Sequence, residues 1–171
     1  RPGDRVVLVF ENCISVAAFI FAASRMDAIV VVVNARLTEA ELERIIAHSD
    51  PSTVVFCTQA SDTAQTHSVE FSATKVYGAF VEVAISKRAN STPEPIFSAP
   101  SEQVAILLYT SGTTGAPKAA MLTHGNLIAA AHASAKVRDM AAADMCYLAL
   151  PLSHIFGLVT FLAVCSAKAA M

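Results

Sequence analysis

The sequence YTSGTTGAPK, at residues 109–118, decides how the rest of the chain is interpreted. It begins at the end of an apolar run, VAILLY at residues 104–109, which predicts a buried strand. From Thr110 to Lys118 there are four hydroxyl side chains, two glycines and one lysine, and no acidic residue. Glycines let backbone N–H groups approach a ligand, hydroxyls donate hydrogen bonds to anionic oxygens, and lysine adds positive charge. This loop therefore predicts a polyphosphate site.

The order of residues in this loop differs from a Walker A loop, in which lysine directly follows the second glycine and precedes Ser or Thr. Here Ala116 and Pro117 separate Gly115 from Lys118, and Ala119 follows the lysine. The loop is therefore not a Walker A motif. The alternative is a flexible surface loop, but such loops rarely combine a preceding buried strand with a Pro-Lys ending.

Composition and charge exclude several classes of protein. Hydrophobic residues make up 54% of the chain and charged residues 15%, which excludes a disordered chain. The formal net charge of −2 provides no basic surface for nucleic acid. The longest apolar stretch, residues 14–33, is interrupted by Arg25 and Asp27, so no membrane span is expected.

The four cysteines are widely spaced and form no C-x-x-C pair, which argues against both a zinc site and a disulfide framework. We therefore expect no protein-bound metal centre. Each cysteine lies in apolar sequence, as buried free thiols do, and this fits a reducing, cytoplasmic compartment. The cysteines are Cys13, Cys57, Cys146 and Cys165.

The first half of the chain alternates between predicted strands and helices, which indicates an α/β fold with a mostly parallel sheet flanked by helices. Asn12 is expected to cap the first helix, and Thr38 with Glu41 forms a capping box for the second. The expected strands are residues 5–10, 28–33 and 53–57, and the expected helices are residues 12–26 and 38–48.

The second half is expected to follow a connecting loop at residues 86–101, which contains three prolines. This loop divides the chain into segments 1–85 and 102–171. Before it we expect a polar helix and a weak strand near Val76. After the strand at 104–109 we expect a helix from about His124 to Val137, a strand at 146–150, a turn at 151–154 and a helix at 157–165.

The stretch YTSGTTGAPKAAMLTHGNL, residues 109–127, resembles the signature of the adenylate-forming superfamily, which contains acyl-CoA synthetases, luciferases and peptide-synthetase adenylation domains. Three further segments resemble the family in the same order: GDRV at 3–6, NARLT at 34–38 and LPLSHIFGL at 150–158. The resemblance implies that the chain is part of the large N-terminal domain of such an enzyme.

The resemblance also implies which residues act. The β- and γ-phosphates of ATP would be held, with Mg²⁺, by Thr110, Ser111, Gly112, Thr113, Thr114, Gly115 and Lys118. A small-molecule carboxylic acid, for example a fatty acid, would attack the α-phosphate to give an acyl-adenylate, and coenzyme A would then take the acyl group as a thioester. Lys118 and His154 are the candidate catalytic residues. His154 would lie beside the acyl and adenylate pocket; the alternative is that it only caps the following helix.

The chain departs from the family pattern at Asp27, Ala119 and Lys168, where glycine is usual. The family's magnesium-binding glutamate, ribose-binding aspartate and C-terminal lysine have no counterpart in the sequence. We therefore expect a fragment that is inactive alone and exposes an apolar face toward the remainder of the enzyme or a second copy. The other interpretations are an amino-acid adenylation domain and a non-catalytic nucleotide-binding module.

Overall fold

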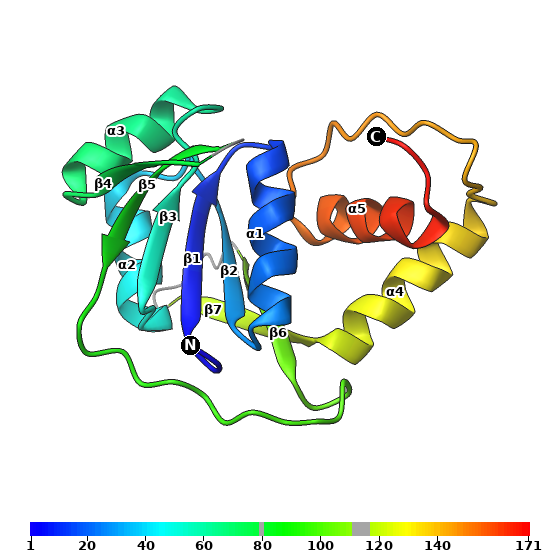
Figure 1. The fold of residues 1–171 in the computed structure, drawn as a ribbon, viewed down its shortest axis with the longest axis horizontal. Helices are drawn as coiled ribbons and strands as arrows, with labels where there is room; N and C mark the ends of the chain where they lie inside the picture. The colour runs from blue at the N-terminus through cyan, green and yellow to red at the C-terminus, as the bar shows by residue number, and fades with distance from the viewer. Residues whose placement is uncertain (79–80, 111–116) are drawn as a thin grey trace.

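The computed structural model describes residues 1–78, 81–110 and 117–171, which form a seven-stranded sheet flanked by helices (Figure 1). The strand order is β4-β5-β3-β1-β2-β6-β7. The strands are β1 (Arg5–Phe10), β2 (Ile29–Asn34), β3 (Thr53–Phe56), β4 (Thr74–Tyr77), β5 (Glu82–Lys87), β6 (Val104–Thr110) and β7 (Lys118–Thr123). The helices are α1 (Ile14–Arg25), α2 (Glu39–Ser49), α3 (Asp62–Glu70), α4 (His124–Val137) and α5 (Ile155–Ala167).

The central strands β3, β1, β2 and β6 are parallel, as the sequence predicts. The outer strands run antiparallel to their neighbours: β5 pairs with β3, β4 with β5, and β7 with β6. The first four residues of β5 lie before the predicted connecting loop, and its last two lie inside it. The sequence analysis did not predict β5 or β7 as strands. Both are short strands with mixed burial, which gives a weak alternation signal.

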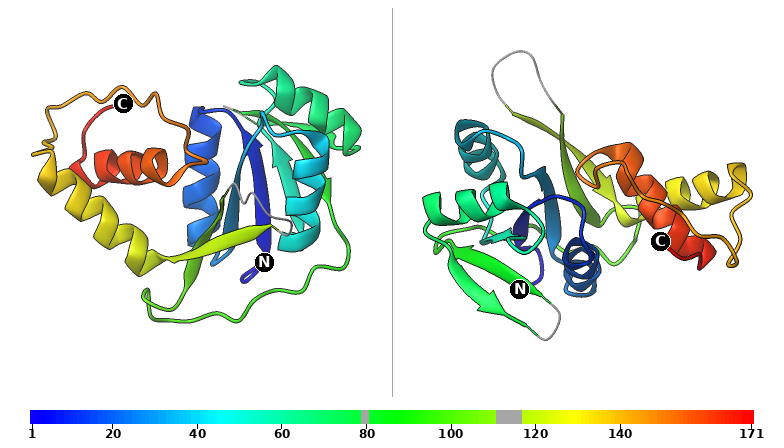
Figure 2. Two further views of the ribbon diagram at one scale, coloured as in Figure 1. Left: turned by 180° about the vertical axis from the view of Figure 1, so that it is seen from behind. Right: turned by 90° about the horizontal axis from the view of Figure 1, so that it is seen from above.

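Each face of the sheet has its own apolar core, because successive side chains of a strand point to opposite faces. In β1, Leu8 and Phe10 pack on the face covered by α1, whereas Val7 and Val9 pack on the face covered by α2 and α3. Figure 2 shows α1 and α2 on opposite sides of the sheet, with α4 and α5 packed together beyond α1. Fully burying one such side chain stabilises the fold by about 1.5–3 kcal/mol.

Two predicted helix starts have different outcomes. The capping box of α2 is present, because the Thr38 N–H donates to Glu41 Oε2 at 2.9 Å and the Thr38 hydroxyl accepts from the Glu41 N–H at 3.4 Å. The prediction that Asn12 caps α1 is wrong, because that helix begins at Ile14 after Cys13 as the N-cap residue. Asn12 uses its amide to hold another part of the chain, described below.

The predicted strand at residues 146–150 is also wrong. Its apolar residues are typical of a strand, but the segment lies beside no free edge of the sheet, whose edges are β4 and β7. Its backbone is held by other contacts: the Cys146 N–H donates to the carbonyl of Ala170 at 2.8 Å, and an isolated bridge joins Met145 to Ala170.

Two of the three positions where the family resemblance expects glycine adopt the left-handed conformation. Asp27, just after α1, has φ 52°, and Lys168, at the end of α5, has φ 58°. Helices commonly end in a glycine with this backbone, since a side chain is disfavoured there. The chain therefore keeps the backbone of these two helix ends while carrying residues that strain it.

The expectation of an exposed apolar face agrees with the structure between residues 145 and 156. Large apolar side chains in this stretch point to solvent, among them Tyr147 with 92% of its surface exposed. The others are Met145, Leu150, Ile155 and Phe156. In the described ranges, none of the helices is both long and apolar enough to cross a bilayer.

Candidate functional site

The predicted phosphate loop connects β6 to β7, and these two strands form an antiparallel hairpin. Thr110 is paired with Lys118 across the hairpin, so the two ends of the loop lie side by side. Both residues are exposed. The predicted phosphate ligands between them lie outside the described residues; these are Ser111, Gly112, Thr113, Thr114 and Gly115. The structure thus brings the first and last predicted ligands together.

The Lys118 side chain is available to an anion. It is exposed, and it forms no ion pair with any residue in the described ranges. The Thr110 hydroxyl, a hydrogen-bond donor, is exposed at the paired position. A cation and a hydroxyl at the two ends of a glycine-rich loop are groups that can bind the terminal phosphates of a nucleotide.

Ala119 lies within β7, where it is paired with Tyr109. Its φ is not among the positive values of the described residues, in contrast to Asp27 and Lys168. The alanine therefore costs no backbone strain at this position. Ala119 lines a cavity of about 260 Å³, together with Tyr109 and His48.

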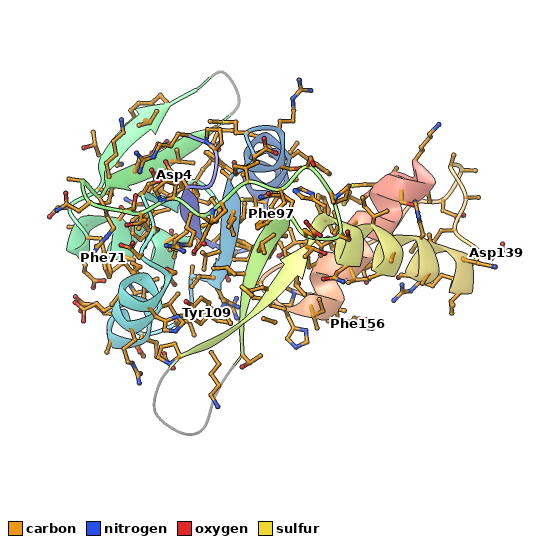
Figure 3. All side chains as sticks on the ribbon, turned by 90° about the horizontal axis from the view of Figure 1, so that it is seen from below. Asp4, Phe71, Phe97, Tyr109, Asp139 and Phe156 are labelled. Atoms are coloured by element: carbon orange, nitrogen blue, oxygen red, sulfur yellow. The ribbon has the colours of Figure 1, made fainter. Side chains whose placement is uncertain are left out.

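The hairpin is attached to α2 by Tyr109, the residue just before the loop. The Tyr109 hydroxyl and His48 Nδ1 are 2.7 Å apart, and the two rings meet edge to face with centroids 5.7 Å apart. Burial raises the pKa of Tyr109, so its phenol stays neutral at physiological pH. Figure 3 shows Tyr109 beside α2, toward the loop end of the hairpin. This contact gives His48 a structural role, because it joins the β6–β7 hairpin to α2.

His154 is the N-cap residue of α5, and its Nδ1 accepts a hydrogen bond from the Phe156 N–H at 3.3 Å. His154 therefore does cap the following helix in the structure. Because Nδ1 is an acceptor, the neutral ring carries its proton on Nε2, and the ring is exposed. The hydrogen bonds of the described residues do not join His154 to Lys118. Capping and ligand contact remain compatible, because they use different nitrogens.

The segment before His154 is fixed at the carboxyl ends of the parallel strands by Asn12. Asn12 Oδ1 accepts from the Leu152 N–H at 2.9 Å, and its amide donates to the carbonyls of Leu150 at 2.8 Å and Leu148 at 3.3 Å. These contacts link positions more than 130 residues apart in the sequence. The sequence analysis missed this role, because nothing local to Asn12 announces it.

Gly157 lets α5 approach this segment closely. A Cβ atom at Gly157 would lie 2.2 Å from the carbonyl oxygen of Pro151 and 2.8 Å from that of Leu150. Real Cβ atoms are not found so close to backbone, so any other residue would displace the segment. The glycine in LPLSHIFGL thus has a packing role that supports the placement of His154.

A polar cavity of about 440 Å³ lies beside this segment, lined by residues at the ends of β1 and β2. In open α/β sheets, ligands commonly bind outside the carboxyl ends of the strands. Arg36 Nε donates to Glu11 Oε1 at 2.7 Å in this cavity, and this bond holds the pKa of Glu11 below its usual value. Asn12 and Ser153 also line it.

The sequence profile of the AMP-binding enzyme family matches residues 1–171, the whole chain. Among individual relatives, the acyl-CoA ligase sidI of Beauveria bassiana is 33% identical over 175 residues and the feruloyl-CoA synthase of Amycolatopsis is 32% identical over 155 residues. These alignments cover 92% and 90% of the chain, respectively. The chain spans about 30% of the length of each.

Solved structures with the same fold include an ATP-bound MatB from Rhodopseudomonas palustris, with a TM-score of 0.73 and 25% identity. That comparison covers 100% of this chain and 35% of MatB. A putative long-chain-fatty-acid CoA ligase from the same organism also gives 0.73, with 27% identity, and covers 99% of this chain and 44% of the ligase. With the profile match over its full length, the chain belongs to the AMP-binding enzyme family.

Proposed function

We propose that the protein activates a carboxylic acid with ATP, giving an acyl-adenylate and then an acyl-CoA thioester, and that this chain supplies the phosphate-binding half of the site. The observation that carries the proposal is the β6–β7 hairpin, which pairs Thr110 with Lys118 across the glycine-rich loop. Relatives named as CoA ligases and synthases support the reaction class.

In this proposal the two ends of the loop bind the β- and γ-phosphates. The Lys118 ammonium neutralises the charge of the phosphate oxygens, and the Thr110 hydroxyl donates a hydrogen bond to them. Ser111, Gly112, Thr113, Thr114 and Gly115 complete the phosphate site. A bound Mg²⁺ would neutralise further phosphate charge, so the residues of this chain chiefly position the nucleotide.

His154 is proposed to face the acyl and adenylate groups. Its Nδ1 is occupied by the Phe156 N–H, so the Nε2–H can donate to a ligand oxygen. Asn12 and Gly157 hold the backbone on either side of it. They act as positioning residues. The four free cysteines favour a reducing compartment, and we propose the cytoplasm.

The proposal is tested by titrating the chain with magnesium-ATP. We expect Lys118→Ala to weaken binding about tenfold or more, since a charged hydrogen bond contributes about 1.5–3 kcal/mol. Lys136→Ala is the matched control, because Lys136 is an exposed lysine on α4 and its loss leaves the hairpin intact. Equal affinity of the parent and Lys118→Ala would contradict the phosphate role.

Turnover is tested separately with ATP, a panel of carboxylic acids and coenzyme A. We expect no pyrophosphate above background from this chain alone, because it spans about 30% of the length of its relatives. Robust pyrophosphate release would contradict this expectation. In a longer protein, pyrophosphate release with amino acids only would favour the adenylation-domain alternative. Nucleotide binding without any pyrophosphate release would favour the non-catalytic module.

A further inference from the structure

The cavity of about 260 Å³ beside the β6–β7 hairpin has no part in the proposed reaction. It lies on the α2 face of the sheet, where Arg5, Ile29 and Leu107 line it from the strands. Its other sides are the end of α2 and the segment between β5 and β6, which crosses the amino ends of the parallel strands in Figure 1. Phe97 and Met121 line it and are exposed, so a ligand can enter from solvent.

We propose that this cavity binds a small uncharged molecule, with an apolar body of one or two rings and a hydrogen-bond-accepting oxygen. The size is inferred from the volume, because a cavity of about 150 Å³ holds benzene whereas pockets for drug-sized ligands begin at about 300 Å³. The apolar body is inferred from the walls, which include Ile29, Val104 and Leu107.

The accepting oxygen is inferred from Arg5. The Arg5 side chain is 15% exposed, and its Nε is buried without a hydrogen-bond partner among the described residues. Leaving a buried donor unpaired costs free energy, which a ligand oxygen would recover. Because Arg5 lines the cavity, its Nε–H is the donor available to such an oxygen.

The absence of charge on the ligand is inferred from the partners of Arg5. Its Nη1 forms an ion pair with Glu94, and its Nη2 lies 3.7 Å from Asp50 Oδ2. Nη2 also donates to the carbonyl of Thr92 at 3.2 Å. One guanidinium with two carboxylates has a net charge of −1, which disfavours an anion beside Nε. A neutral acceptor is therefore favoured over a carboxylate or a phosphate, and this distinguishes the cavity from the phosphate loop.

The test titrates the isotope-labelled chain with coumarin, a neutral two-ring lactone, and with two matched compounds. Naphthalene has the same two-ring shape without the oxygen, and coumarin-3-carboxylate adds a negative charge. We expect coumarin to shift the backbone amide signals of residues 104–107, which lie along the cavity. It should bind about threefold or more tightly than either matched compound, since one hydrogen bond changes affinity by about two- to tenfold. Equal or tighter binding of a matched compound, or no shift at these residues, would overturn the proposal.

Ala119→Leu places a larger side chain in the cavity and should weaken coumarin binding about tenfold or more. Ala120→Leu is the matched control. Ala120 is exposed on the other face of β7, where it is paired with Leu108, so the affinity should stay within about twofold. Unchanged affinity in Ala119→Leu would place coumarin elsewhere and overturn the proposal.

Arg5→Lys tests the donor. Lysine keeps a positive charge beside Asp50 and Glu94 but has no Nε–H, so coumarin affinity should fall to that of naphthalene. Circular dichroism checks that the variant is folded, and if it is not, the Ala119→Leu comparison alone decides. A folded Arg5→Lys chain that still prefers coumarin to naphthalene would refute the role of Arg5.

Discussion

The β6–β7 hairpin and the carboxyl-edge segment at residues 148–154 are built in opposite ways. The hairpin brings together residues that are close in sequence, since Thr110 and Lys118 meet through the pairing of adjacent strands. The segment is held by Asn12, more than 130 residues away, and by the absence of a side chain at Gly157. A local motif can therefore be read from sequence, whereas the surface that positions His154 depends on the completed fold.

The largest effect is expected from Gly157→Ala. The new methyl group would meet the Pro151 carbonyl oxygen, a backbone atom that cannot move as a side-chain tip can. We expect a loss of about 1–3 kcal/mol in the free energy of unfolding, typical of overpacking. Chemical denaturation measures it, and hydrogen exchange should increase at residues 148–156 but not in the hairpin.

Gly78→Ala is the control for that substitution, because its Cβ would make only an ordinary contact, 3.5 Å from the Val81 carbonyl oxygen. It should change stability by no more than about 0.5 kcal/mol. If the two glycine variants were equally stable, α5 would not depend on close approach at Gly157.

Most of the fold was predictable because its signals are local. Each of these signals lies within a few consecutive residues: the β-branched runs of β1, β2 and β3, the capping box at Thr38, and the apolar strand before the loop. The failures have a non-local cause. Residues 146–150 have the apolar character of a strand but no sheet edge to join, and Asn12 bonds to Leu152 in place of the adjacent helix.

Asn12→Ala should affect the segment at residues 148–154 and leave the hairpin unchanged. It removes one acceptor and two donors that hold the segment, at an exposed site where each hydrogen bond contributes about 0.5–1.5 kcal/mol. We expect a destabilisation of about 1–2 kcal/mol with faster exchange of the Leu152 amide. Magnesium-ATP affinity should remain within about twofold, since the side-chain hydrogen bonds of Asn12 among the described residues go to Leu148, Leu150 and Leu152 and not to β6 or β7.

Asn12→Asp is the matched variant. It keeps the acceptor for the Leu152 N–H but loses the donors to the Leu148 and Leu150 carbonyls. It should protect the Leu152 amide while leaving the preceding backbone less ordered. The role assigned to Asn12 would be refuted if Asn12→Ala left exchange at residues 148–152 unchanged.

Tyr109→Phe makes the corresponding change in the hairpin. It removes the 2.7 Å contact with His48 but keeps the ring that packs edge to face against it. We expect a loss of about 0.5–1.5 kcal/mol. Exchange should increase at β6 and β7 and stay constant at residues 148–154, the reverse of the Asn12→Ala result.

Tyr77→Phe controls for loss of a phenol elsewhere, because Tyr77 on β4 is 71% exposed. Its stability should match that of the parent chain. Equal effects of the two tyrosine variants would show that the hydroxyl of Tyr109 is not what joins the hairpin to α2.

The smallest expected effects are gains in stability at the two helix ends with positive φ, the larger of them from Lys168→Gly. Lys168 ends α5 with φ 58°, a conformation that costs most residues about 1–2 kcal/mol but glycine almost nothing. Part of this gain is offset, because glycine makes the unfolded chain more flexible by about 0.4–1 kcal/mol. We therefore expect a net stabilisation of about 0.5 kcal/mol, seen as a higher denaturation midpoint with an unchanged slope.

Asp27→Gly should gain less, since aspartate tolerates this backbone better than lysine. Lys136→Gly in the body of α4 should lose about 1 kcal/mol instead. If Lys168→Gly also destabilised the chain, the lysine side chain would be making a contact that outweighs its backbone strain. The glycine expected there from the family would then not be explained by conformation alone.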